Sequence, residues 1–267
     1  MCFKVSKIAF MKIHFLGTGT SQGIPVIGSQ HPVCLSNDPK DQRLRVSVWV
    51  EMPYANIIID CGPDFRSQML RSKCPSIDAI LFTHEHADHT AGLDDIRPFY
   101  FSQGAIPIYA HQRVVHNLRR RFDYILNDEN KYPGAPSVLV REIENNQNFS
   151  VGPYEIIPID FLHGNLQVFG FRMENFAYLT DVKTIKEVEI QKLKNLEILV
   201  VNALRNEPHD THFNLEDALA FIKIVQPKKA YLTHISHRMG FHEEISKELP
   251  ENVFLAYDTL TLEINSK

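Results

Sequence analysis

Four side chains of the kinds that bind metal ions stand close together in the stretch LFTHEHADHTAGLDDI, at residues 81–96. They are His84, His86, Asp88 and His89. In an extended segment residues i and i+2 point the same way, so His84 and His86 can approach one ion together. Asp88 and His89 then enter a helical turn and can face a second ion. The spacing predicts the start of a two-metal site, because one ion rarely takes four adjacent ligands.

The remaining ligands of such a site must come from distant parts of the chain. His163 follows the apolar run IIPIDFL, Asp181 ends FAYLTD, and His234 ends KAYLTH. A lone histidine at the end of a strand is more often structural. Three polar residues in similar positions, beside the His-x-His-x-Asp-His run, favour one shared metal site.

The elements that position these residues are short. Several apolar runs are continuous and rich in Val and Ile, which is typical of strands covered on both faces. Between them lie stretches with apolar spacing near 3.6, which predicts helices, and Asn214 is placed as an N-cap. We expect strands at 12–17, 46–51, 56–62, 78–84, 106–111, 154–160, 166–173, 176–181, 196–203, 229–235 and 253–258, and helices at 63–73, 112–126, 182–195, 214–226 and 242–249.

Composition describes an ordinary globular chain: 267 residues, 44% hydrophobic and 22% charged. We expect a single domain, residues 1–267, with residues 1–10 as an upstream extension if Met11 is the true start. A net charge of −4 gives no reason to expect nucleic-acid binding. No apolar run approaches the roughly 18 residues of a membrane span, and no secretion signal is recognisable, so we expect a cytoplasmic protein without a membrane partner.

One basic cluster and four cysteines need separate interpretation. Arg113 and residues 119–121 form the cluster, for which a solvated helix face is favoured over a phosphate-binding patch. The cysteines, at positions 2, 34, 61 and 74, show no paired spacing of a disulfide framework. We expect them to be thiols, with Cys61 and Cys74 in the core.

The motif THEHADH, with His163, Asp181 and His234, resembles the metallo-β-lactamase superfamily. The stretches FLGTGTSQGIPVIG, IIIDCGPDFR, AYLTDV and LTHISH resemble its PhnP-like phosphodiesterase branch, which is related to RNase Z. The resemblance runs from residue 12 nearly to the C-terminus. It implies an α/β fold, the αββα metallo-β-lactamase sandwich of two mixed β-sheets flanked by helices, with the site at the sheet edge.

The resemblance also implies which residues bind each of the two metal ions. Nitrogen and carboxylate ligands suit two Zn²⁺ or Mn²⁺ ions, and bound water then has its pKa lowered toward about 7. The expected activity is metal-dependent hydrolysis of small or cyclic phosphodiesters, with a small molecule as the partner. The first ion takes His84, His86 and His163, the second takes Asp88, His89 and His234, and Asp181 bridges them.

Besides the ligands, four more residues are expected around the metals: His212, His209, Arg205 and Asp60. Asp88 and His212 are the expected catalytic residues, and His212, which aligns with a substrate-site histidine of the branch, is assigned to phosphate binding or general-acid catalysis. The alternative for His212 is a surface histidine in a polar loop. His209 is a weaker candidate for the same pocket, as is Arg205. Asp60 either supports a metal ligand by hydrogen bonding or caps the turn at residues 62–63.

PhnP-like proteins often hold a third, structural zinc with cysteines in the opening loop and a histidine after the last active-site histidine. This chain has Ser29, His31 and Cys34, with His237 downstream. His31, Cys34 and His237 are plausible ligands and Ser29 is a poor one, where a closed zinc site needs four. The resemblance also suggests a homodimer.

Two other functions stay open. An RNase Z-like tRNA 3′-processing endonuclease shares the ligand set, but its members usually carry a long Gly/Pro-rich arm that is missing from this sequence. A non-catalytic, metal-dependent carrier, resembling relatives in pyrroloquinoline quinone biosynthesis, would bind a small molecule without turnover.

Overall fold

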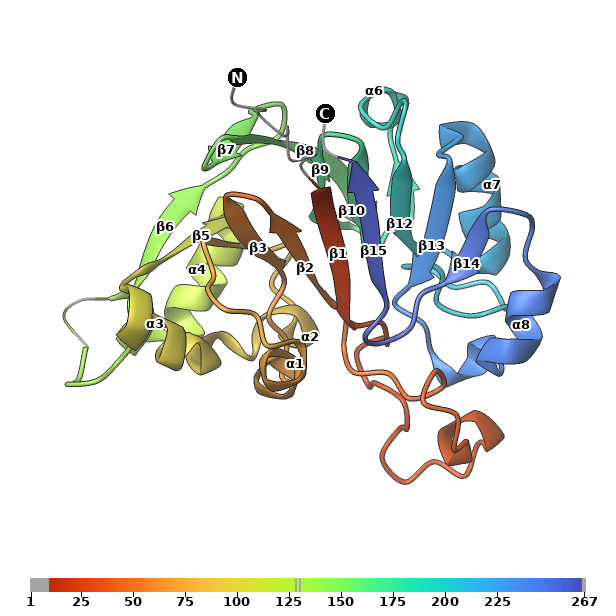
Figure 1. The fold of residues 1–267 in the computed structure, drawn as a ribbon, viewed down its shortest axis with the longest axis horizontal. Helices are drawn as coiled ribbons and strands as arrows, with labels where there is room; N and C mark the ends of the chain where they lie inside the picture. Colours follow the sequence, from red (N-terminus) through yellow and green to blue (C-terminus); the bar gives the residue numbers. More distant parts are fainter. Residues whose placement is uncertain (1–9, 128, 130, 266–267) are drawn as a thin grey trace, which may run out of the picture.

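The computed structural model describes residues 10–127, 129 and 131–265. The expected N-terminal extension lies outside the described residues, except for Phe10, which begins the first strand. The described residues form two mixed β-sheets that pack face to face, with helices on both outer sides (Figure 1). The predicted αββα layering is confirmed.

The first sheet is antiparallel in one half and parallel in the other. The order is β15-β1-β2-β3-β4-β5-β6, with parallel pairing from β3 to β6. Parallel strands place their carboxyl ends at one edge, which is where the His84 motif emerges from β4. The strands are β1 Phe10–Gly17, β2 Ser47–Met52, β3 Ala55–Ile59, β4 Ala79–Leu81, β5 Ile106–Ala110, β6 Val138–Glu142 and β15 Thr261–Asn265.

The second sheet repeats this plan. Its order is β11-β8-β9-β10-β12-β13-β14, β7 pairs with β8, and the pairing is parallel from β10 to β14. Its carboxyl ends therefore also meet at one edge. The strands are β7 Phe149–Val151, β8 Tyr154–His163, β9 Leu166–Met173, β10 Phe176–Leu179, β11 Thr184–Ile185, β12 Ile198–Asn202, β13 Lys229–Thr233 and β14 Val253–Leu255.

The helices cover the outer faces of the sheets. In Figure 1, α1, α3 and α4 lie outside the first sheet, and α7 and α8 lie outside the second. Asn214 caps α7 as predicted, since its side chain accepts the Asp217 backbone N–H at 2.9 Å. The helices are α1 Phe65–Ser72, α2 Ala87–Thr90, α3 Arg97–Gln103, α4 Gln112–Arg121, α5 Asp123–Leu126, α6 Glu187–Gln191, α7 Leu215–Val225 and α8 His242–Glu248.

Alternation along the strands divides the core into layers. Met11, Ile13 and Phe15 of β1 point between the two sheets, where they join one large apolar cluster. Leu16 belongs instead to the cluster beneath α1 and α4. Cys61 and Cys74 are buried in that outer cluster, as expected from the sequence. The sheets are therefore held rigidly from both faces, which fixes the edge that carries the site.

Two predicted helices are wrong in part. In the range 182–195 only α6 is helical, because the preceding residues pair with β8 as strand β11. The helix predicted over 112–126 breaks at Phe122, whose φ of −131° separates α4 from α5. Strands β6, β7, β11 and β15 and helix α3 were not predicted, whereas the helical turn expected at Asp88 and His89 is helix α2. Sheet pairing and tertiary packing, rather than local propensity, decide these segments.

Among the described residues, no helix has both the length and the apolar character needed to cross a membrane.

The long segment between β1 and β2 projects from the end of the first sheet (Figure 1) and is tied down by a buried arginine. The Arg43 guanidinium is 3% exposed and donates to Thr18 Oγ1 at 2.8 Å and to the Ala256 carbonyl at 2.5 Å. Asp258 accepts from the Thr18 hydroxyl and from the Leu44 backbone N–H. These contacts join the projecting segment to the C-terminal strands.

His242 closes this network and makes stability depend on pH. Burial, followed by the positive charges of Arg43 and Lys40, lowers the pKa of His242 from its usual 6.5 to about 4. As pH falls from 6.5 to 4, the His242 side chain is protonated in the unfolded chain but stays neutral in the folded one. The folded state therefore loses stability over that pH window. We expect the loss from this residue to be about 3 kcal/mol. A His242→Asn variant should show a flatter stability profile in denaturant titrations between pH 4 and 7, and parallel profiles would contradict the assignment.

Candidate metal centre

Three polar residues at the shared edge adopt the left-handed backbone conformation directly after a strand. Asp60 follows β3 with φ 61°, Asp181 lies just beyond β10 with φ 65°, and His234 follows β13 with φ 56°. Residues other than glycine pay a conformational cost there, and such strain gathers at functional sites. All three side chains turn toward the same place, the loop that leaves β4.

That loop is packed tightly by two glycines. A Cβ atom at Gly62 would stand 1.9 Å from the Asp88 carbonyl oxygen, and one at Gly92 would stand 2.1 Å from the Gly62 carbonyl oxygen. Backbone bonds of 2.9 Å from Cys61 to His89 and from Gly92 to Cys61 close the contact. The turn after β3 therefore holds helix α2, and with it Asp88 and His89, at a fixed position.

Asp181 lies at the middle of the cluster. One carboxylate oxygen, Oδ1, is 3.2 Å from His234 Nε2 and 2.9 Å from His212 Nε2, and the other, Oδ2, is 3.4 Å from His89 Nε2. Asp88 Oδ2 lies 3.2 Å from His89 Nε2 and 3.7 Å from His234 Nε2. A carboxylate between side chains from different segments of the chain is the arrangement expected of a bridging group.

His84, His86 and His163 form the other side of the cluster. The ring centroids of His84 and His86 are 4.5 Å apart, and His163 lies 5.9 Å and 5.3 Å from them. His84 is fully buried, whereas His86 is exposed and opens the cluster toward solvent. The structure thus brings together all seven residues predicted as ligands of the two ions.

Donor atoms within 4.8 Å of one another define three groups among the described residues. One group consists of Asp88, His89 and His234, which are the three ligands predicted for the second ion. The other two cross the predicted division, because Asp181 is grouped once with His84 and His89 and once with His163 and His212. His86 is in none of them. The cluster is therefore a property of the structure, and its division into two ligand sets stays a prediction.

The histidines present unpartnered nitrogens to this cluster. The Nε2 atoms of His84, His89 and His234 are buried without a hydrogen-bond partner. The opposite ring nitrogens, Nδ1, form hydrogen bonds outside the cluster. His84 Nδ1 donates to Thr83 Oγ1 at 3.0 Å, and His89 Nδ1 donates to Asp60 Oδ2 at 2.7 Å. A buried polar atom without a partner is costly. Imidazoles fixed at one nitrogen and free at the other are suited to binding a metal ion.

The protonation states favoured inside the cluster also suit the binding of cations. Burial alone would raise the pKa of Asp88 and of Asp181, but the neighbouring imidazoles of His89 and His234 outweigh it and hold both pKa values below the usual range. Burial lowers the pKa of His84, which favours the neutral ring that a metal requires. The residues present therefore fit divalent metal ions bound by nitrogen and carboxylate.

Asp60 hydrogen-bonds to the ligand loop rather than to the turn at residues 62–63. It is fully buried, and it accepts the Thr83 backbone N–H at 2.9 Å and the Thr83 hydroxyl at 2.8 Å in addition to His89 Nδ1. Burial raises its pKa, opposed by the His89 and Thr83 contacts. Asp60 therefore orients His89 and the residue before His84.

His212 enters the cluster, whereas Arg205 does not. His212 is 9% exposed, and its ring stacks on His234 at 4.9 Å and meets His163 edge-on at 4.3 Å. His209 lies behind it, with the Nδ1 atoms of the two rings 3.3 Å apart. The Arg205 guanidinium donates to backbone carbonyls of its own loop. The sequence alternative of a surface histidine is therefore wrong for His212.

Of the residues predicted for a third metal, Ser29, His31 and Cys34 lie in the projecting segment, and His237 follows β13. The His31 and His237 rings meet edge-on at 4.9 Å, and His237 Nδ1 is buried without a partner. Cys34 Sγ instead accepts the Val26 backbone N–H at 3.5 Å, and Ser29 Oγ accepts the His31 N–H. Within the described residues, the donors of His31, Cys34 and His237 are not among the groups within 4.8 Å.

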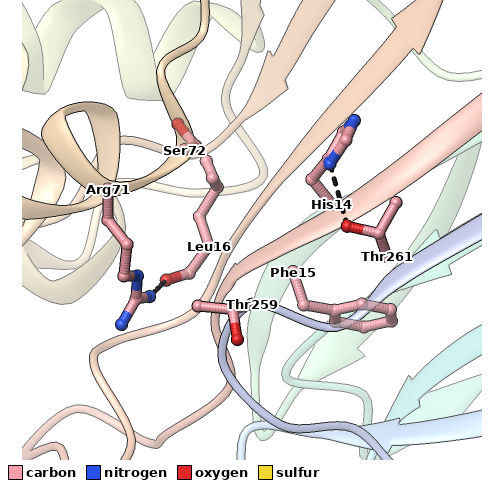
Figure 2. A pocket seen from close by; sticks show the side chains of 7 residues that line it. All are labelled: His14, Phe15, Leu16, Arg71, Ser72, Thr259 and Thr261. Carbon is pink, nitrogen blue, oxygen red and sulfur yellow. Dashed lines mark hydrogen bonds between the residues drawn. The ribbon is translucent and has the colours of Figure 1, made fainter.

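A pocket of about 660 Å³ opens beside the cluster. His86 and His163 form its inner wall, and Lys183 and Asp210 contribute opposite charges to its lining. A separate pocket of about 200 Å³, shown in Figure 2, lies between α1 and the β1–β15 edge and contains no residue of the cluster. There Arg71 already donates to the Leu16 carbonyl. Of these two pockets, the first borders metal-binding residues and the one in Figure 2 does not.

Sequence reasoning missed several contacts of the site. Thr83 and Glu85 stand on either side of His84 in the motif. Their roles become visible only in the structure, where Thr83 donates to Asp60 and Glu85 accepts from Arg113. Lys183 stands two residues after Asp181, which is a local signal that could have been used. Arg113 contacts Glu85, although it was interpreted as part of a solvated helix face.

Residues 55–235 match the sequence model of the Beta-lactamase superfamily domain. The chain therefore belongs to the metallo-β-lactamase superfamily, and its fold is that of metal-dependent hydrolases. Within the superfamily it is PhnP-like. The crystal structure of a new diphosphatase from the PhnP family is 37% identical, with a TM-score of 0.89, covering 96% of this chain and 97% of that one. Zn²⁺-bound PqqB from Methylobacterium extorquens, at 17% identity and a TM-score of 0.79 over 94% and 99% of the two chains, shares the fold.

Two curated relatives are longer than this chain. A Porphyromonas gingivalis protein named octanoyltransferase is 36% identical over 259 residues, which are 96% of this chain and 52% of that protein. Ribonuclease Z of Bacillus licheniformis is 28% identical over 204 residues, 72% of this chain and 60% of its own. The chain thus spans between half and two thirds of the length of these relatives.

Proposed function

We propose that this protein is a dinuclear metal-dependent phosphodiesterase acting on small or cyclic phosphodiesters. One observation carries the proposal: Asp181 lies within 3.4 Å of the Nε2 atoms of His89, on helix α2, and His234, just after strand β13, beside an open pocket. The relative described as a PhnP-family diphosphatase supports phosphorus chemistry. The name octanoyltransferase belongs to a protein about twice as long and gives no substrate for this chain.

Two Zn²⁺ or Mn²⁺ ions bound here would supply an activated water and positive charge for the phosphoryl oxygens. His84, His86 and His163 would hold one ion, Asp88, His89 and His234 the other, and Asp181 both. His212 would hydrogen-bond a phosphoryl oxygen or protonate the departing alkoxide, and His209, whose Nδ1 lies 3.3 Å from that of His212, would support it. Asp88, from helix α2, would hold the second ion and is the other expected catalytic residue.

A third ion at His31, Cys34 and His237 is a separate and weaker proposal. The unpartnered His237 Nδ1 and its contact with the His31 ring support it, and the engagement of Cys34 with Val26 counts against it. Metal analysis of the purified, reloaded protein distinguishes two bound ions from three.

The test of the proposed function is a substrate panel on protein loaded with Zn²⁺ or Mn²⁺. We expect hydrolysis of bis(p-nitrophenyl) phosphate and of at least one cyclic phosphodiester. Octanoyl thioesters and precursor tRNA test the other two activities suggested by the relatives. Turnover of the thioester or the tRNA alone would overturn the proposal, and binding of a small molecule without any turnover would favour a carrier.

Lys183 is the residue of the pocket that we expect to recognise additional substrate charge. Its Nζ lies 2.9 Å from Asp217, and its side chain reaches the pocket beside His163. In a Lys183→Met variant, KM for a dinucleoside diphosphate, which carries a second negative charge, should rise about tenfold. The KM for bis(p-nitrophenyl) phosphate should change less, and kcat should stay near wild type. Lys186→Met, an exposed neighbour outside the pocket, is the matched control, and an equal rise in both variants would contradict this role.

A further inference from the structure

Arg113 of α4 contacts two chain segments that carry predicted ligands of the same ion. Its Nε donates to Glu85 Oε1 at 2.8 Å, and its Nη2 donates to the Gln167 carbonyl at 2.5 Å. Glu85 stands between His84 and His86. Gln167 pairs with Leu162 in the β8–β9 hairpin, one residue from His163. One guanidinium therefore joins the loop of the first two histidines to the hairpin of the third.

The contact is partly shielded from water. The Glu85 side chain is 16% exposed and that of Arg113 is 34% exposed. Glu85 Oε2 is buried without a hydrogen-bond partner, so its carboxylate depends on Arg113 for charge compensation. Charge-assisted hydrogen bonds to a fixed guanidinium fork set direction as well as distance. This geometry restrains the backbone between the two histidines.

Arg121, eight residues further along α4, supports the other end of the loop. Its Nη1 donates to Thr90 Oγ1 at 2.7 Å, and the Thr90 hydroxyl donates to the His86 carbonyl at 2.8 Å. The arginines between them, Arg119 and Arg120, are exposed. The basic cluster is thus divided. Its two ends contact the metal-ligand loop, and the middle fits the solvated face expected from the sequence.

We propose that Arg113 is a positioning residue that holds the loop of His84 and His86 against the hairpin of His163 and thereby sets the affinity of that half of the metal centre. This rests on the two-ion site of the proposed function. The other half, at Asp88, His89 and His234, is held by Asp60 and by the turn after β3, which Arg113 does not contact. The two halves should therefore respond differently to loss of Arg113.

The experiment is a Zn²⁺ titration of metal-free full-length protein against a competing chelator, with no substrate present. For Arg113→Met we expect one class of ions to bind about 10- to 100-fold more weakly, the range for residues that orient metal ligands. The weakened class should be the one that His86→Ala removes. Arg113→Lys should recover part of the loss, because an ammonium can pair with Glu85 but cannot also reach Gln167 in the same fork geometry.

Arg119→Met, an exposed change on the same helix, is the matched control and should bind both ions like wild type. Thermal unfolding of the metal-free variants separates a folding defect from a positioning effect. Wild-type affinity for both ions in Arg113→Met, or equal weakening of both classes, would overturn the proposal. If the wild-type protein binds one ion only, the two-ion function fails by itself, and an unchanged affinity for that ion in Arg113→Met would overturn the present proposal too.

Discussion

An Asp181→Asn substitution should reduce kcat for bis(p-nitrophenyl) phosphate by about 10³-fold at saturating metal, equivalent to about 4 kcal/mol of lost transition-state stabilisation. Asp181 is 2% exposed and faces His89, His212 and His234 at 3.4 Å or less. The amide keeps the shape but removes the negative charge that would balance the two proposed cations. Steady-state kinetics with a metal count on the same sample measure the effect.

The matched control is Glu189→Gln, which neutralises another buried carboxylate. Glu189 is 1% exposed and accepts from the Asp160 backbone N–H and from Lys192, away from the cluster. We expect this variant to be less stable but to keep kcat within about twofold. Asp181→Asn with wild-type turnover would show that this carboxylate is not part of the catalytic site.

Asp60→Asn should weaken metal binding by about 10- to 100-fold and lower activity at limiting metal. The carboxylate accepts three hydrogen bonds, from His89 Nδ1 and from the backbone and hydroxyl of Thr83. An asparagine oxygen can retain only part of this set, and its NH₂ group would face the His89 N–H. The His89 ring would then lose the fixed orientation that directs Nε2 into the cluster. Excess metal should restore most of kcat, which distinguishes this effect from that of Asp181→Asn.

Asp258→Asn provides a close control for this substitution. Asp258 is also buried and likewise accepts a backbone N–H, from Leu44, and a threonine hydroxyl, from Thr18, but at the far network of Arg43. It should destabilise the fold without changing metal affinity. Equal losses of affinity in both variants would mean that Asp60 acts through general stability alone.

The sequence predicted the parts of this protein that local pattern determines. Continuous apolar runs located β8, β9, β10, β12 and β13 close to their observed bounds, because strands buried on both faces need such residues. The His-x-His-x-Asp-His run identified the cluster of histidines and aspartates, since the turn from β4 into α2 is encoded in adjacent residues. The distant members His163, Asp181 and His234 were recognisable because each closes a strand.

Contacts between segments that are remote in sequence could not be predicted in this way. Arg113 was placed in a solvated cluster because helical periodicity does not reveal which loop packs against α4. The segment at 182–185 has helical spacing, yet Lys183 and Thr184 pair with Leu162 of β8. Strand β6 has an apolar run of only three residues, 138–140, which is too short to identify a strand by itself, and it pairs in parallel with β5.

The most direct test of the account is a stepwise titration of metal-free protein with Zn²⁺ or Mn²⁺, in which bound ions are counted while hydrolysis of bis(p-nitrophenyl) phosphate is followed. A two-ion phosphodiesterase predicts that activity rises mainly with the second bound ion and stays about 10³-fold lower in Asp181→Asn even at saturating metal. Full activity with one bound ion, or no hydrolysis of any phosphodiester with two ions bound, would contradict it.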